Sequence, residues 1–153
     1  MQKFLSCACA VLVLCAAARA SEYSNWKADN ADANDRLVKL LKDHPNFRGA
    51  LNGVANQNLS GLQLYVEFLS EKGDRNTGDF IDKYPKESKG IKRLHENYPD
   101  QVKALRETIR DHPKSTKALF SSEAIVDGVI AAAEGREEAQ KSEKKSKKKR
   151  KDD

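Results

Sequence analysis

The sequence contains no cysteine after residue 15. All three cysteines, Cys7, Cys9 and Cys15, lie in the apolar N-terminal segment. If that segment is removed, the mature chain has no disulfide, no thiolate nucleophile and no cysteine ligand for zinc. The sequence also lacks a nucleophile elbow, a glycine-rich phosphate loop and a His-Glu-x-x-His helix. We therefore predict no catalytic residue and no cofactor site, and we expect a protein that is not an enzyme.

The N-terminal segment, residues 1–20, has the features of a secretory signal peptide. Lys3 precedes an apolar run from Phe4 to Ala18, and Ala18-Arg19-Ala20 matches a small-x-small cleavage site. The run is shorter than the roughly twenty apolar residues of a membrane-spanning helix. A lipoprotein signal is the alternative, but neither Cys7 nor Cys15 has a convincing acylation site before it. We expect export to a periplasmic or extracellular location.

Every proline follows an aromatic or imidazole ring. The pairs are His44-Pro45, Tyr84-Pro85, Tyr98-Pro99 and His112-Pro113. The last three pairs are spaced fourteen residues apart, so residues 80–121 can be divided into three similar units of fourteen residues. Residues 40–53 form a further unit of the same kind. Proline fixes φ near the helical value, whereas the residue before it is pushed out of the α region. Each pair therefore predicts the end of one helix and the start of the next.

Two roles follow for the residues around each proline. We expect the ring to fill the corner between the two helices. We also expect the preceding Asp or Asn to accept hydrogen bonds from the free amides of the next helix. These residues are Asp43, Asp82, Asn97 and Asp111.

The apolar residues recur at helical spacing, without the alternation of a strand. Residues 59–69 form the most apolar stretch of the mature chain and predict a central helix. We predict an all-α fold of short helices broken at aromatic-Pro corners, arranged as a repeat-like small bundle or solenoid. The last apolar stripe, from Ile125 to Ala133, predicts a C-terminal helix that runs into a charged tail.

The composition divides the chain into four parts. Residues 1–20 are the expected signal peptide, and residues 21–34 are an expected polar N-terminal leader that ends in a helix cap at Asn34 or Asp35. Residues 35–140 form the helical domain, with repeat-like units at 40–53 and 80–121 and a loop at 71–78. Residues 141–153 form a lysine-rich tail, disordered or frayed. Asn58 begins an acceptor sequence for glycosylation, which matters only in a eukaryote.

The tail is the one functional feature that the sequence makes prominent. Residues 141–151 carry a net charge of +7, whereas residues 21–140 carry −2. The basic residues are Lys141, Lys144, Lys145, Lys147, Lys148, Lys149, Arg150 and Lys151. Such blocks are typical of interaction arms that attract anionic polymers and surfaces. We expect partners such as lipid headgroups, cell-wall polymer, extracellular nucleic acid or an acidic protein.

Two alternatives remain open at this point. A metal-handling or enzymatic periplasmic protein could use His44 and His112, which share the sequence Asp-His-Pro, with Asp43 or Asp111 as further ligands. However, tyrosine replaces histidine at the two intervening corners, and carboxylates such as Glu67 form no distinctive acid-base pair. The other alternative is a structural protein with no discrete ligand.

Three stretches, residues 40–51, 80–91 and 94–105, resemble uncharacterised exported bacterial helical proteins in which Phe/Leu-Leu-x-x-His-Pro phrases repeat. The resemblance covers at most Leu37 to Phe120, and it is interrupted at residues 71–79, where a Gly-Asp-rich loop replaces a His-Pro corner. It implies an exported helical repeat domain. It implies no active site and no ligand.

Overall fold

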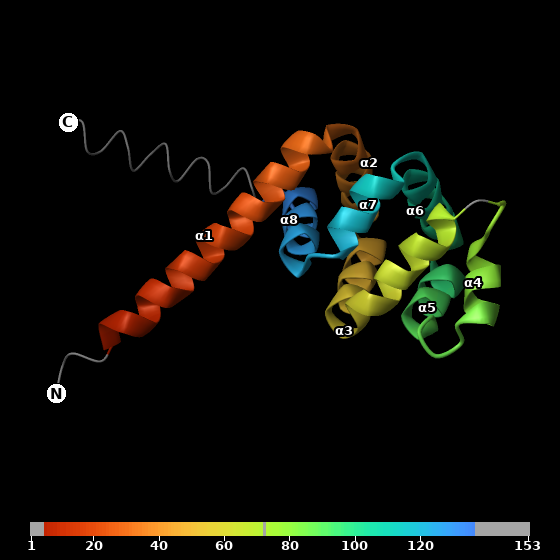
Figure 1. Ribbon diagram of the computed structural model, residues 1–153, viewed down its shortest axis with the longest axis horizontal. Coiled ribbons are helices and arrows are strands. Elements are labelled where there is room, and N and C mark those ends of the chain that lie inside the picture. Colours follow the sequence, from red (N-terminus) through yellow and green to blue (C-terminus); the bar gives the residue numbers. More distant parts are fainter. Residues whose placement is uncertain (1–4, 72, 137–153) are drawn as a thin grey trace.

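The computed structural model describes residues 5–71 and 73–136, with side chains from residue 16 onward. This part of the chain contains eight α-helices and no strand, which confirms the predicted all-α fold. The helices are α1 (Leu5–Asp29), α2 (Ala31–Asp43), α3 (Pro45–Ser70), α4 (Thr77–Lys83), α5 (Lys89–Asn97), α6 (Pro99–Asp111), α7 (Pro113–Phe120) and α8 (Glu123–Ala133). Helices α5, α6, α7 and α8 pack around α3 (Figure 1), so the arrangement is a bundle rather than a solenoid.

The four corner residues share one backbone conformation. His44, Tyr84, Tyr98 and His112 have φ between −126° and −138° and ψ between 57° and 73°. Each corner carbonyl accepts a hydrogen bond of 2.9 to 3.0 Å from the amide four residues later. A helix begins at the proline in three of the four cases. The exception is Pro85, which is followed by a turn at residues 85–88 before α5 begins.

The corner rings do not all fill their corners. Tyr98 is half-buried and packs edge-on against Phe47, with ring centroids 5.7 Å apart. Tyr84 is also half-buried and packs against Phe68 and Phe80. His44 is exposed. The predicted packing therefore holds at the two tyrosine corners and fails at His44.

The predicted caps at the proline corners are wrong. Helices α3, α6 and α7 have no side-chain cap hydrogen bond. Asp43 instead pairs with Lys39, and Asn97 donates to a carbonyl of its own helix. The physical reason is position: these residues lie in the last turn of the preceding helix, where partners on that helix or across the bundle are nearer.

The expected polar leader, residues 21–34, belongs to the folded core, so that prediction is also wrong. Tyr23 and Trp26 of α1 are 3 % and 5 % exposed. The Tyr23 hydroxyl donates to Asn34 Oδ1 at 2.9 Å, and Trp26 Nε1 donates to the Ser115 carbonyl at 3.1 Å. Asn34 is buried within α2 and begins no helix, because α2 starts at Ala31. The polar residues next to Tyr23 and Trp26 face solvent. Their composition gave no indication that the two rings between them are buried.

The N-terminal part of α1 extends away from the bundle (Figure 1). Residues 16–22 are exposed, so the predicted cleavage site lies in α1 outside the core. The signal peptide itself stays a prediction. In the region that the structure covers, no helix is both long and apolar enough to cross a membrane.

Helix α3 is broken at Asn58, which has φ −154° and ψ 64°. Its Oδ1 accepts from the amide of Gly61 at 3.0 Å, so Asn58 caps the second half of α3, the predicted central helix. Its Nδ2 donates to the Glu87 carbonyl at 2.9 Å. A glycan would be attached at this nitrogen, so glycosylation of the folded chain would have to accommodate the sugar beside the Glu87 carbonyl.

Candidate functional site

The basic tail lies outside the described residues. All eight basic side chains from Lys141 to Lys151 are among the residues that the structure does not describe. Their role as the anion-binding element stays a prediction, and the candidate sites described below lie on the folded body.

The two Asp-His-Pro corners are not brought together. His44 follows the end of α2, where its Nδ1 lies 3.4 Å from Gln101 Nε2 at the start of α6. His112 follows the end of α6 and lines a hollow of about 280 Å³ together with residues from 28–33, at the start of α2. Helix α2 has 13 residues, so its two ends, near which the two histidines lie, are about 20 Å apart. No cluster of three or more metal-ligating side chains occurs among the residues with described side chains.

A shallow charged groove lies between the end of α3 and the corner of α6 and α7. Two adjoining hollows of about 370 and 430 Å³ share Ser70, Glu71 and Pro113. The first is also lined by Glu67, Lys114 and Lys117, and the second by Leu69, Gly73, Asp74 and Arg110. Both open widely to solvent.

The carboxylates of this groove are already paired. Lys117 Nζ lies 3.0 Å from Glu67 Oε1, and Glu71 pairs with Arg75. Arg110 Nη2 lies 3.0 Å from Asp74 Oδ1. A general acid or base needs a proton-transfer group directed at substrate, and these groups are directed at one another across an open surface. The groove therefore offers charge but no evident catalytic pair.

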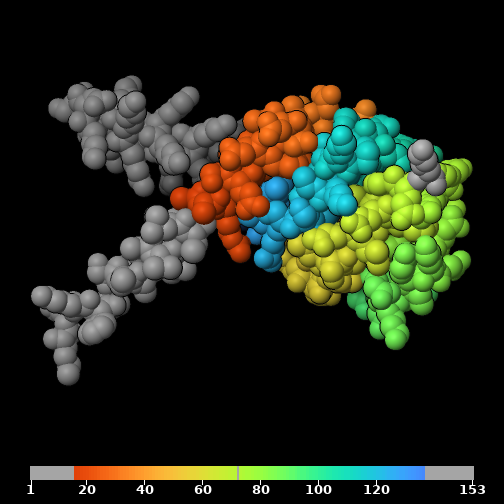
Figure 2. Space-filling view, viewed as in Figure 1, coloured from red at the N-terminus to blue at the C-terminus, as the bar shows by residue number. Residues whose placement is uncertain are grey.

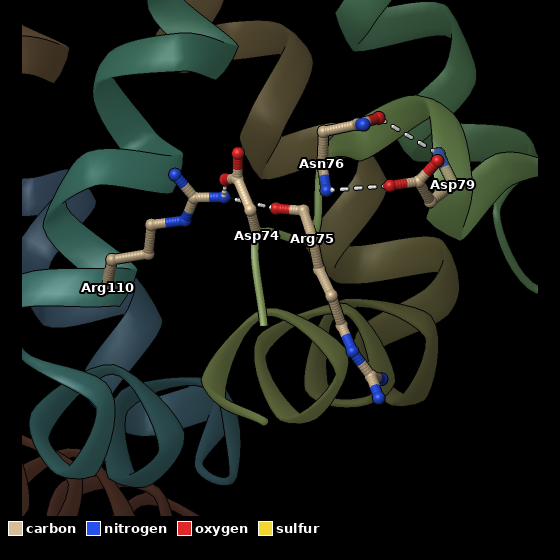
Figure 3. A network of polar contacts seen from close by, with 5 residues as sticks. All are labelled: Asp74, Arg75, Asn76, Asp79 and Arg110. Carbon is tan, nitrogen blue, oxygen red and sulfur yellow. Dashed lines mark hydrogen bonds and ion pairs between the residues drawn. The ribbon is translucent and has the colours of Figure 1, made fainter. Parts of the chain in front are cut away.

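The loop beside the groove is clamped from both ends (Figure 3). Arg110 of α6 donates to Asp74 Oδ1 at 3.0 Å and also to the carbonyl of Arg75. Asn76 and Asp79 form a reciprocal capping box at the start of α4, with bonds of 3.0 and 3.2 Å. Loop 73–76 thus anchors α4 to α6.

A buried pair of hydroxyl groups lies on the interior side of loop 73–76. Tyr65 of α3 and Thr77 of α4 have hydroxyl oxygens 2.8 Å apart, and both residues are buried. Burial raises the pKa of the Tyr65 phenol, an effect that the hydrogen bond to Thr77 partly opposes. The phenol therefore stays neutral at ordinary pH and joins α3 to α4.

The folded body also has a basic surface that was not predicted from the sequence. It lies on α4, the turn at 85–88 and α5. We name it the basic face, and its residues are Lys83, Lys86, Lys89, Lys92 and Arg93, all exposed. A local count would have found it, because residues 83–93 carry a net charge of +4. The net charge of −2 over residues 21–140 gave no indication of the basic face, because acidic residues elsewhere in that range outweigh it.

Comparisons with protein-family models, with curated proteins and with solved structures give no match for this chain.

Proposed function

We propose that this protein is an exported, non-enzymatic helical binding or scaffold module whose basic tail attaches it to an anionic surface or polymer. Lipid headgroups, cell-wall polymer and extracellular nucleic acid have the required charge, as does an acidic protein. The observation that carries the proposal is the separation of charge along the chain. Residues 141–151 carry a net charge of +7, and residues 21–140 carry −2.

Two features of the described body support a binding role over catalysis. The carboxylates of the charged groove are satisfied by Lys117, Arg75 and Arg110. In addition, His44 and His112 lie at opposite ends of α2. Binding by a block of like charge needs no preformed pocket, because long-range attraction and counterion release supply the free energy.

The test compares the intact protein with a variant in which all eight tail basic residues are changed to glutamine. We expect the intact protein to be retained on an anionic matrix at about 0.1 M salt and released at about 1 M, as the Debye length falls from about 10 Å to 3 Å. The variant should keep its melting temperature and lose most of the retention. Equal retention of the two proteins would overturn the proposed role of the tail.

A further inference from the structure

The basic face concentrates charge on one side of a helix. Lys89, Lys92 and Arg93 are spaced i, i+3 and i+4 on α5 and share its solvent side. The opposite side of α5 buries Ile91 and Leu94 in the core. The three basic side chains of α5 therefore lie together on its solvent side, and the exposed Lys83 and Lys86 precede them on α4 and in the turn.

Few of these charges are neutralised by an ion pair. Lys92 Nζ lies 3.9 Å from Glu96 Oε1, a long and exposed contact. No ion pair involves Lys86, Lys89 or Arg93 within the residues that the structure describes. The acidic residues of α4, the 85–88 turn and α5 are Asp79, Asp82, Glu87 and Glu96, one fewer than the five basic residues of the face. The basic charge thus exceeds the acidic charge locally.

Of the helices that pack against α5, α3 adds no acidic group along its adjoining part. Residues 49–66 of α3, which packs against α5, contain no charged side chain. The exposed residues of this stretch are Gly49, Asn56, Gln57 and Ser60. This part of α3 therefore leaves the positive potential of the basic face uncompensated.

Close backbone packing holds the face in place. A Cβ added to Gly61 of α3 would lie 2.7 Å from the Glu87 carbonyl oxygen, and one added to Gly90 of α5 would lie 2.7 Å from Val54 Cγ1. Such distances are too short for a real Cβ, so both glycines permit a contact that alanine would disturb. The Asn58 side chain fixes the same turn through the Glu87 carbonyl. The turn and α5, which carry four of the five basic side chains, are therefore packed closely against α3.

We infer that the basic face is a second anion-binding surface that adsorbs on an anionic phospholipid membrane, independently of the tail. Among the residues that the structure describes, the hollows given above are lined by residues outside the basic face, whose charged side chains are exposed. The basic face lies at the outer end of the molecule, away from α1 (Figure 2). An outward surface of this kind suits a planar layer of headgroups.

An aromatic ring at the edge of the face favours the same partner. Lys83 Nζ lies 5.3 Å from the ring centroid of Tyr84, which is half-buried. Tyrosine rings with one apolar and one polar end are enriched at membrane interfaces, and lysines near an anionic leaflet each strengthen adsorption about fivefold. The inference rests on the proposed function only in taking an anionic surface as the partner.

The experiment uses the chain from Ser21, which keeps Tyr23 and every later residue of the described core and lacks the apolar segment that would itself enter vesicles. Three glutamine variants are compared with the parent chain. The first neutralises the eight basic residues of the tail, and the second neutralises the tail and the basic face together. The third is a matched control that neutralises the tail and five exposed lysines elsewhere: Lys39, Lys42, Lys103, Lys114 and Lys117.

Binding is measured by co-sedimentation with vesicles of one part phosphatidylglycerol to three parts phosphatidylcholine, and with pure phosphatidylcholine. The tail variant should still bind the anionic vesicles in a salt-sensitive way. Adding the face substitutions should lower its partition coefficient by about tenfold or more, while the matched control should change it by less than about threefold. Circular dichroism checks that all variants fold.

If the tail variant binds anionic vesicles no better than neutral ones, the inference is overturned while the proposed role of the tail stands. If the tail variant binds as tightly as the parent chain, the proposed role of the tail fails and the basic face is the main binding element. If the tail variant binds single-stranded DNA but not the anionic vesicles, the choice of lipid as the partner is overturned. Equal losses in the face variant and the matched control would also overturn the inference, because net charge alone would explain binding.

Discussion

Gly128 of α8 lies directly against the ring of Tyr23 in α1. A Cβ added to Gly128 would overlap the Cγ atom of that ring, so glycine sets how closely the two helices approach. This contact joins the first and last helices of the described body, and it continues into the hydrogen bond from Tyr23 to Asn34. Because glycine has no Cβ, α8 can pack directly against the Tyr23 ring of α1.

We predict that Gly128→Ala destabilises the protein by about 1 to 3 kcal/mol, because Tyr23 must move and its hydrogen bond must lengthen. Gly49→Ala is the matched control. Gly49 also lies inside a helix, with no atom within 4 Å of its added Cβ, so alanine there should stabilise by up to about 1 kcal/mol. Urea denaturation measures both changes. A neutral Gly128→Ala variant would show that α1 and α8 do not pack as described.

The only tryptophan, Trp26, reports whether the N-terminal residues belong to the core. Because Trp26 is 5 % exposed, its fluorescence should be blue-shifted in the native protein and should move to longer wavelength on unfolding, together with the loss of helical circular dichroism. The same result is expected for the chain that begins at Ser21. A water-exposed emission spectrum in the native chain would instead support the polar leader expected from the sequence.

Replacing Tyr98 separates the size of the corner ring from its chemistry. Tyr98→Ala removes the contact with Phe47, where the centroids are 5.7 Å apart, and should cost about 1 to 3 kcal/mol. Tyr98→His should cost less, since His112 occupies the equivalent corner with a nearly identical backbone. Thermal and urea denaturation of both variants measure the difference. Equal losses would mean that the ring does not fill the corner.

The buried phenol of Tyr65 predicts a loss of stability at alkaline pH. Its folded pKa is raised by burial above the ordinary value of about 10. Its contribution is therefore fully present below pH 10 and is lost as the pH rises through the folded pKa, because the unfolded chain gives up the proton first. The free energy of unfolding should fall in this range, and it should fall less in Tyr65→Phe. Identical alkaline profiles for the two proteins would exclude this role.

Local signals in the sequence predicted most of the helix boundaries. Proline acts on its own backbone and on the residue before it, so the corners at Tyr98 and His112 could be placed without any tertiary information. Serine favours the N-cap position, and Ser122, just before α8, accepts at its Oγ from the Ile125 amide at 3.4 Å. The apolar spacing of residues 59–69 placed the central helix correctly.

Features that depend on distant partners could not be predicted in this way. The burial of Trp26 depends on Ser115, which is 89 residues away in the chain, and the polar residues around Trp26 gave no sign of it. The separation of His44 from His112 depends on the direction of α2 and α6, which a repeated motif does not specify. The basic face escaped notice because a charge total says nothing of where the charges gather.

The packing of α1 on α8 also determines when the protein can finish folding during its synthesis. Tyr23 and Trp26 are among the first core residues to leave the ribosome, whereas Gly128 is near the end of the described body. At about 5 to 20 residues per second, the interval between them is on the order of 10 s. Throughout that interval the Tyr23 ring lacks its final contact with α8. A nascent chain in this state remains open to any factor that must engage it before its core closes.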